Sequence, residues 1–284
     1  MGKTAVSIAL AQHLGTSIIS ADSRQCYRGM TIGTAKPDAA EMAAVKHYFI
    51  DSHDITQPLT AADYETLALG YIGEVLQRHD TAVVCGGTGL YINALCHGLD
   101  DMPATEPHIT KQVEEAYAAN GLEWLQRAVE KEDAAFYASG EILNPARMIR
   151  ALSFVRTTGT SITQYRTNTH KQRPFRIVKV ALELPRDLLY NRINQRVDAM
   201  MEQGLESEVR ALLPYRHLKN LHTVGYAELF EYFEGNCTLR EAIEKVKQHS
   251  RNYAKRQLTW FRKDPEMHWL RPDDATIVEQ ITAL

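Results

Sequence analysis

The chain of 284 residues is 44% hydrophobic and 24% charged with a formal net charge of −3, a balance typical of a soluble globular protein with one elaborated domain or two. No apolar run approaches the roughly 18 residues of a membrane-spanning helix, and the first ten residues lack the ordered regions of a secretory signal. The four scattered cysteines show no zinc-site spacing, so we expect reduced cysteines and a cytoplasmic protein without a membrane partner.

A helical pattern begins at once, after Gly2-Lys3-Thr4, with apolar residues four apart up to Leu14. Gly-Lys-Thr at a helix N-terminus is the end of a P-loop, in which backbone amides hold phosphate, the lysine neutralises it and the threonine hydroxyl meets Mg²⁺. A match of only three residues occurs often by chance, and the first glycine of the P-loop motif is absent from this sequence.

A β-branched run at residues 17–19 predicts a buried strand, and a long polar loop at 20–37 follows it. Ligands of open α/β sheets bind at the carboxyl ends of the strands, where an acid such as Asp22 can accept a proton from a substrate. The alternative is that Asp22 only caps a turn.

A second strand–turn–helix unit contains Gly86-Gly87-Thr88-Gly89. Its geometry is that of a phosphate site, with the Thr88 hydroxyl at the end of a strand; the alternative is a tight turn that needs glycine. Around it we expect helices at 38–45 and from Thr60, in a capping box with Asp63, to His79, and strands at 47–51 and 81–85.

Prolines at 103 and 107 precede a stretch with helical periodicity and little strand signal. We expect helices at 109–120, 122–130 and 145–157, in a helical insertion at 104–173 within a core formed by 1–103 and 174–284. Arg147 and Arg150 share a helix face because they are three apart.

The last part of the chain alternates strands and helices. We expect strands at 175–184 and 267–270, and helices at 186–201, 205–213, from 224, 238–263 and 273–283. The whole pattern predicts an α/β fold, a P-loop NTPase-like doubly wound parallel sheet with a helical insertion domain.

Basic residues are concentrated in two segments without acids: 144–182 holds eight Lys or Arg and 245–263 holds seven, which leaves 17 basic against 35 acidic residues elsewhere. Such segments in an acidic chain are typical of a surface that binds a nucleic-acid backbone. The alternative is chance clustering with ion pairs to the acidic remainder. A phosphate site, an acid at a strand's end and a basic face together indicate a transferase acting on nucleic acid.

The chain resembles the tRNA dimethylallyltransferases, also called tRNA isopentenyltransferases, over nearly its whole length. The matching motifs are GKT at 2–4, SADSRQCYRGMTIGTAKP at 20–37, TAADY at 60–64, GGTGLY at 86–91, NPARMIRAL at 144–152, RINQRVDAMMEQGLESEV at 192–209, VGY at 224–226 and YAKRQLTWFRK at 253–263. The resemblance implies transfer of a dimethylallyl group from its diphosphate to N6 of the adenine on the 3′ side of the anticodon, with Mg²⁺, release of diphosphate and a flipped adenine.

By position, the resemblance makes Asp22 the general base on the adenine amine and Thr88 its hydrogen-bonding neighbour. Gly2, Lys3 and Thr4 would bind the diphosphate, with Thr4 on the metal. Contacts with the tRNA anticodon stem-loop would come from Ser23, Arg24, Gln25, Arg147, Arg150, His222, Gly225, Tyr226, Lys255, Arg256 and Gln257. We expect a monomer.

This chain departs from the family pattern at its start, because the family begins with an apolar strand and G-P-T-A-S-G-K-T. We therefore expect an upstream start, with a strand and the full phosphate loop. Three alternatives remain: a relative that prenylates free adenine nucleotides, a small-molecule P-loop kinase, and a non-enzymatic RNA-binding protein.

Overall fold

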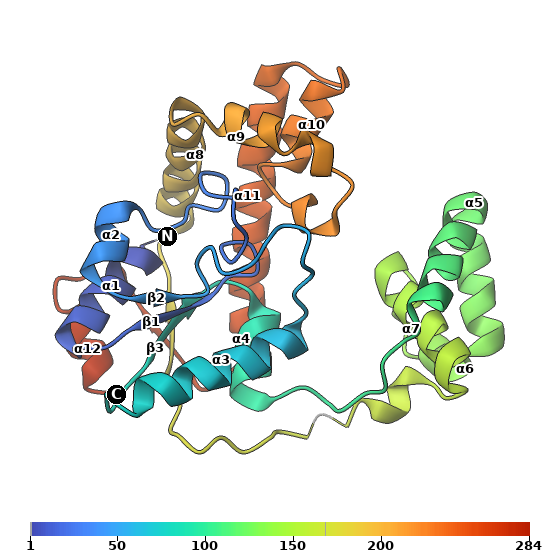
Figure 1. Cartoon of the computed structure of the whole chain (residues 1–284), viewed down its shortest axis with the longest axis horizontal. Helices are drawn as coiled ribbons and strands as arrows, with labels where there is room; N and C mark the ends of the chain where they lie inside the picture. Colours follow the sequence, from blue (N-terminus) through green and yellow to red (C-terminus); the bar gives the residue numbers. More distant parts are fainter. Residues whose placement is uncertain (1, 168) are drawn as a thin grey trace. The chain divides into compact units, whose positions relative to one another are not determined.

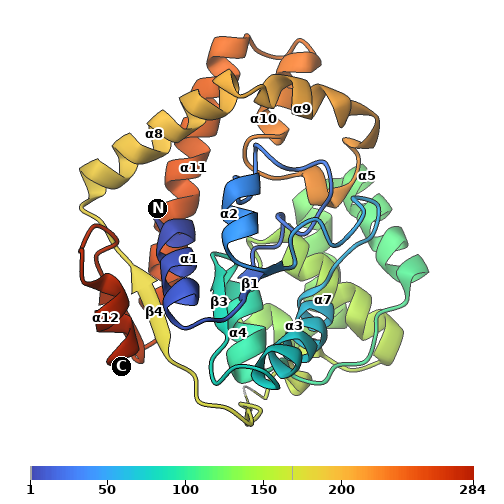
Figure 2. The same cartoon turned by 60° about the vertical axis from the view of Figure 1, so that its left-hand side comes forward.

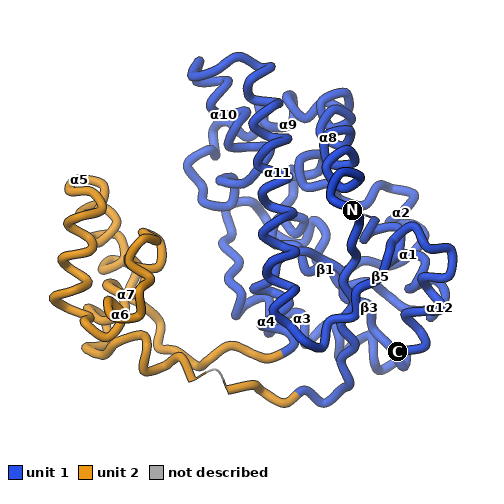
Figure 3. The backbone as a smooth tube through the Cα atoms, turned by 180° about the vertical axis from the view of Figure 1, so that it is seen from behind, with its two compact units in different colours: residues 1–96, 173–284 blue, residues 97–172 orange. Residues whose placement is uncertain are grey.

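Two compact units make up the chain (Figure 3). The computed structural model describes residues 2–167 and 169–284. The first unit comprises residues 1–96 and 173–284, and the second comprises residues 97–172. Within the described residues, no helix is both long enough and apolar enough to cross a membrane.

The first unit alternates strands and helices (Figure 1). Its elements are α1 (Lys3–His13), β1 (Ile18–Ala21), α2 (Ala39–Ala44), β2 (His47–Tyr48), α3 (Ala61–Leu76), β3 (Val83–Gly86), α4 (Gly89–His97), β4 (Lys179–Leu182), α8 (Arg186–Glu202), α9 (Leu205–Ala211), the 3₁₀ turns η2 (Leu213–Tyr215) and η3 (Lys219–Leu221), α10 (Ala227–Phe233), α11 (Leu239–Phe261), β5 (Met267–Leu270) and α12 (Ile277–Thr282).

All strand pairs of this unit are parallel, as the βα alternation predicts. The first sheet has the order β2-β1-β3, with Ile18 opposite Val83 and Ala21 opposite Gly86. Successive residues of β1 point to opposite faces: Ile18 packs into the cluster beneath α1, whereas Ile19 packs into the larger cluster that includes Tyr64 of α3. Helices therefore cover both faces of the sheet (Figure 2).

The parallel α/β class is confirmed, and the strands fall into two sheets rather than one. β4 pairs with β5, and β3 is an edge strand of the first sheet. An apolar groove of about 800 Å³ is lined by β3 and β4 together with side chains of α1 and α11. Val84 and Val178, which line this groove, are 37% and 42% exposed.

Several element boundaries differ from the sequence-based expectations. The strand expected at 47–51 ends at Tyr48, because Phe49 and Asp51 take positive φ angles of 65° and 49° that no strand contains. The strand expected at 175–184 is confined to Lys179–Leu182, and the last helix begins at Ile277. The capping box of Thr60 and Asp63 is confirmed.

Within its described residues the second unit has helices and no strand, as predicted: α5 (Pro107–Glu132), α6 (Ala134–Ala138), α7 (Pro145–Thr158) and the 3₁₀ turn η1 (Ile162–Tyr165). Gly121 interrupts α5 with φ 76° and ψ −170°, which is the break expected between two helices. Helices α5 and α7 bury a separate core around Leu125, Phe136 and Leu152. This unit therefore has its own hydrophobic centre.

Candidate functional site

Asp22 lies directly after β1, at the carboxyl end of the first sheet. Its Oδ1 atom accepts hydrogen bonds from the backbone amides of Arg24, at 2.9 Å, and Gln25, at 3.4 Å. Within the described residues, Oδ2 has no hydrogen-bond partner. One carboxylate oxygen therefore caps the turn, as the alternative interpretation held, while the other remains available as a base.

Thr88 joins the end of β3 to the Asp22 loop. Its backbone amide donates to Ala21 O at 3.1 Å, and its Oγ1 accepts from the Ser23 amide at 3.0 Å and donates to Ser23 Oγ at 3.3 Å. Gly86 makes this approach possible, since a Cβ there would lie 2.2 Å from Ala21 O. The structure thus brings the two residues expected to be catalytic, Asp22 and Thr88, to the same edge of the sheet.

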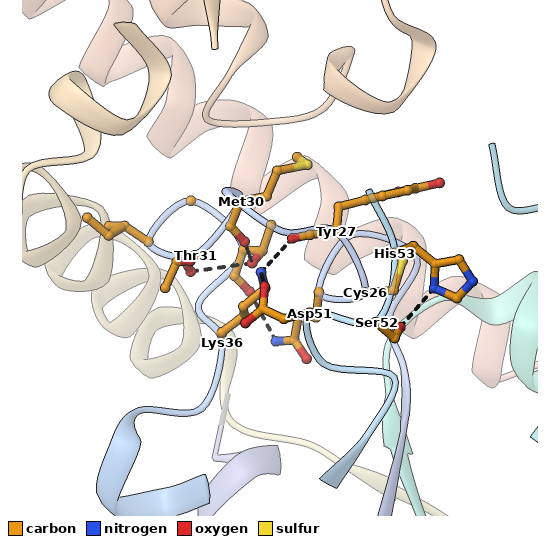
Figure 4. Close-up of polar contacts among 12 residues, drawn as sticks. Cys26, Tyr27, Met30, Thr31, Lys36, Asp51, Ser52 and His53 are labelled. Carbon is orange, nitrogen blue, oxygen red and sulfur yellow. Dashed lines mark hydrogen bonds and ion pairs between the residues drawn. The ribbon is translucent and has the colours of Figure 1, made fainter. Parts of the chain in front are cut away.

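The loop after Asp22 is held by its own polar groups. The ammonium of Lys36, which is 1% exposed, donates to Tyr27 O at 2.6 Å and to Asp51 at 2.5 Å (Figure 4). The Gln25 amide donates to Thr34 O and Ala35 O, at 3.1 and 3.0 Å. Gln25 was expected to contact RNA, but its side-chain N–H groups donate to acceptors within the loop.

The expected diphosphate residues lie at the start of α1. Gly2 caps the helix with φ 102°, and Lys3 and Thr4 are its first two residues. Burial raises the pKa of the Cys85 thiol on β3; Lys3 opposes this rise and Asp22 adds to it. Cys85 Sγ also donates to Lys3 O at 3.8 Å, so the start of α1 lies against β3 one residue before Gly86.

Two side chains of α11 cover the glycines on either side of Thr88. Gln257 Nε2 donates to Gly87 O at 2.7 Å, and a Cβ on Gly87 would lie 2.1 Å from that nitrogen. A Cβ on Gly89 would lie 2.5 Å from Trp260 Nε1. Only glycine leaves room for these two side chains, and their contacts hold the turn around Thr88 against α11.

The turn at 222–226 is packed into the first unit rather than displayed. Tyr226 is 0% exposed and Gly225 is buried. The Gly225 amide donates to Glu228 at 2.8 Å, and the other oxygen of Glu228 pairs with His249 of α11 at 2.6 Å. His222 is exposed and its Nε2 donates to Arg216 O at 3.1 Å.

Comparison with known proteins identifies the family. A protein-family model described as IPP transferase matches residues 25–264. The chain belongs to this family. Its matched region includes the Asp22 loop from Gln25 onward, the Thr88 turn and the whole of α11.

Curated relatives match nearly end to end. The chain is 43% identical over 280 residues to a tRNA dimethylallyltransferase 1 of Phocaeicola vulgatus, covering 99% of this chain and 93% of that protein. It is 42% identical over 274 residues to a tRNA dimethylallyltransferase of Christiangramia forsetii, covering 96% and 91%.

Solved structures of the family have the same fold. A tRNA isopentenylpyrophosphate transferase of Bacillus halodurans aligns with a TM-score of 0.71 at 38% identity, covering 99% of this chain and 90% of that one. A eukaryotic dimethylallyltransferase described as acting on tRNA aligns with a TM-score of 0.79 at 23% identity, covering 99% and 74%, which supports the fold alone.

Most basic residues of the two acid-free segments are neutralised within the chain. Nine of the fifteen form ion pairs with Asp or Glu: Arg147, Arg156, Arg166, Lys171, Arg173, Lys179, Lys245, Lys247 and Arg262. Arg147, in the second unit, pairs with Glu141 at 2.6 Å, whereas Arg150 donates to the Met102 sulfur at 3.8 Å and forms no ion pair among the described residues of that unit. The alternative interpretation therefore accounts for much of the clustering.

Three cations of the second acid-free segment lie together at the end of α11 and just after it. Lys255, Arg256 and Lys263 form no ion pair within the described ranges. They line a surface depression of about 480 Å³ together with Asn252, Thr259 and Trp260. Trp260 is 45% exposed. Cations around an exposed indole suit a nucleic-acid backbone with an unstacked base.

Sequence reasoning did not single out two ionisable residues, on α8 and α11, that interact electrostatically with Asp22. Burial lowers the pKa of the Arg196 guanidinium on α8, and the Asp22 carboxylate partly offsets this effect. Burial raises the pKa of the Tyr253 phenol on α11, and Asp22 adds to the rise. In the sequence, Arg192 and Arg196 are one helical turn apart, which places them on one face of α8. Nothing in the sequence relates α8 or α11 to the Asp22 loop.

An oxygen donor suited to Mg²⁺ is present at the start of α1. The Thr4 hydroxyl has no hydrogen-bond partner among the described residues. No cluster of three or more His, Cys, Asp or Glu that could hold a metal occurs in the described parts of the chain. Mg²⁺ commonly takes only one or two protein oxygens and completes its shell with water and substrate phosphates. The residues present fit such an ion.

Proposed function

We propose that this protein transfers a dimethylallyl group from dimethylallyl diphosphate to N6 of the adenine on the 3′ side of the anticodon in tRNA. The observation that carries the proposal is Asp22 at the carboxyl end of β1, with one capped and one available oxygen, beside Thr88. Membership of the IPP transferase family and the names of the relatives support it. We further propose a monomer that works in the cytoplasm.

In the proposed reaction the adenine N6 attacks C1 of the dimethylallyl group. The C–O bond to the diphosphate breaks as the C–N bond forms, and the amine proton passes to Asp22 Oδ2. A base in hydrogen-bond reach contributes about 10²–10⁴-fold to such a step. Thr88 holds the backbone of Ser23, and with it the start of the Asp22 loop, at the sheet edge.

The leaving diphosphate would bind at the start of α1, where Gly2, Lys3 and Thr4 supply amides, an ammonium and a hydroxyl. The buried guanidinium of Arg196 on α8 is a further cation, and Asp22 favours its charged form. Mg²⁺, held by Thr4 and the diphosphate, would neutralise negative charge on the leaving group. The tRNA would lie against Lys255 and Arg256 at the end of α11, with Ser23 and Arg24 near the reacting base.

The test is incubation with labelled dimethylallyl diphosphate, Mg²⁺ and either unmodified total tRNA or free AMP. We expect label in RNA and none in AMP. Label in AMP alone would favour a nucleotide prenyltransferase, and tRNA binding without label would favour an RNA-binding protein. Asp22→Ala is expected to abolish transfer while leaving tRNA affinity largely intact; turnover within tenfold of the unmodified chain would remove Asp22 from the base role.

A further inference from the structure

Glu208, on α9, binds four donors with one side chain. Its Oε2 accepts from the amides of Thr31 and Ile32, at 2.9 and 2.7 Å. Its Oε1 accepts from the Gly33 amide, at 3.0 Å, and from the Tyr226 hydroxyl, at 2.7 Å. Three consecutive backbone amides that point to one carboxylate form an anion-binding nest.

The four contacts join two segments that are far apart in sequence. Residues 31–33 belong to the loop that begins at Asp22, whereas Tyr226 belongs to the turn at 222–226. The segments also touch directly, since a Cβ on Gly33 would lie 2.6 Å from the Tyr226 ring. Burial raises the pKa of the Tyr226 phenol and the Glu208 carboxylate adds to the rise, so this hydroxyl remains a hydrogen-bond donor.

The far side of the loop transmits this anchoring towards Asp22. Gln25 binds Thr34 O and Ala35 O, the residues that follow the nest, through its side chain. The backbone amide of the same residue donates to Asp22 Oδ1 at 3.4 Å. A displacement of residues 31–33 would therefore shift the Asp22 carboxylate through the Gln25 side chain.

We propose that Glu208 is a positioning residue for the prenyl transfer, which rests on the function proposed above. Its carboxylate fixes the 31–33 nest against Tyr226 and so sets the relative position of the Asp22 loop and the 222–226 turn. It does not touch the reacting atoms. A role of this kind predicts that loss of Glu208 impairs the use of tRNA while the diphosphate end of the site is unaffected.

Glu208→Gln is the sharpest variant because each carboxylate oxygen serves two donors. In either orientation of the glutamine side chain, its NH₂ group replaces an oxygen that accepts from at least one backbone N–H. At least one backbone amide of the nest therefore loses its acceptor. Glu206→Gln is the matched control on the same helix, where Glu206 pairs only with the exposed Arg210 at 2.7 Å. Tyr226→Phe removes one of the four donors and leaves the nest in place.

The experiment measures kcat and KM for tRNA, the affinity for dimethylallyl diphosphate, and hydrogen exchange over residues 25–37 and 222–230. Glu208→Gln is expected to lower kcat/KM for tRNA by about 10²-fold, as a displaced loop does. Exchange should rise in both segments, with diphosphate affinity unchanged. In Glu206→Gln all these quantities should match the unmodified chain.

The Tyr226→Phe effect should shrink in a Glu208→Gln background, since the two groups act through one hydrogen bond. Equal kcat/KM in the Glu208 and Glu206 variants would overturn the proposal, as would a loss of diphosphate affinity in parallel with that of tRNA. If the unmodified chain transfers no label, the proposed function fails. The positioning role is then tested by hydrogen exchange and by the affinity for tRNA in the absence of dimethylallyl diphosphate. It is refuted if both quantities are unchanged in Glu208→Gln.

Discussion

Thr88→Val tests the link between β3 and the Asp22 loop. Valine has nearly the shape of threonine but no hydroxyl, so the substitution removes two contacts of Thr88 Oγ1, with Ser23 N at 3.0 Å and Ser23 Oγ at 3.3 Å. Thr88→Ser keeps both the acceptor and the donor. The pair of variants therefore separates the hydroxyl from the methyl group.

The cost follows from the amide left without an acceptor. An unsatisfied donor costs about 1–3 kcal/mol, and Ser23 is only partly buried, so about 1–2 kcal/mol applies. For a chain of this size that lowers the melting temperature by roughly 2–8 °C. Turnover should fall much further, by about 10²-fold, because the loop that carries Asp22 loses its anchor.

Thermal melting and label transfer to tRNA measure both effects in one buffer. Thr88→Ser should resemble the unmodified chain in both, while Thr88→Val should lose turnover out of proportion to its stability. If the valine and serine variants have the same turnover, the hydroxyl contributes nothing to the reaction, and the anchoring of the Asp22 loop by Thr88 is refuted.

Further predictions use other contacts. Lys255→Ala should weaken tRNA binding and flatten the log–log salt slope by about one unit, whereas Lys247→Ala, already paired with Asp198 and Glu244, should leave the slope unchanged; equal slopes would contradict a phosphate contact. Gly89 is the first residue of α4, so alanine gains less there than the ~1 kcal/mol of a helix interior. Gly89→Ala should lower the melting temperature because the new Cβ would lie 2.5 Å from Trp260 Nε1, and the loss should be smaller when Trp260 is also Ala; additive shifts would rule out the clash.

Local rules explain what was predictable from the sequence. The helix at Thr60 begins with a capping box whose partners are three residues apart, and the structure contains it. The proximity of Asp22 and Thr88 follows from parallel strands, because the carboxyl ends of such strands meet at one edge. These inferences need only neighbours along the chain and one topological rule.

The remaining features depend on contacts between distant elements. The ion pair of Arg173 with Glu65, at 2.7 Å, joins residues that are 108 apart in sequence, so a segment without acids gives no sign of it. Glu208 looks like any surface glutamate in sequence, since backbone amides carry no side-chain signature. The strand expected at 47–51 was overestimated because a hydrophobic pattern does not reveal the positive φ angles of Phe49 and Asp51.

The open strand edges along the apolar groove have a consequence for the behaviour of the protein in bulk solution. β3 and β4 each present main-chain groups without a strand neighbour beside half-exposed valines, which is the combination that templates pairing between molecules. Loss of soluble protein should then be governed by encounters between copies rather than by unfolding of one copy. The rate of aggregation would depend on protein concentration more strongly than on temperature. A preparation that stays soluble at low concentration would aggregate when it is concentrated.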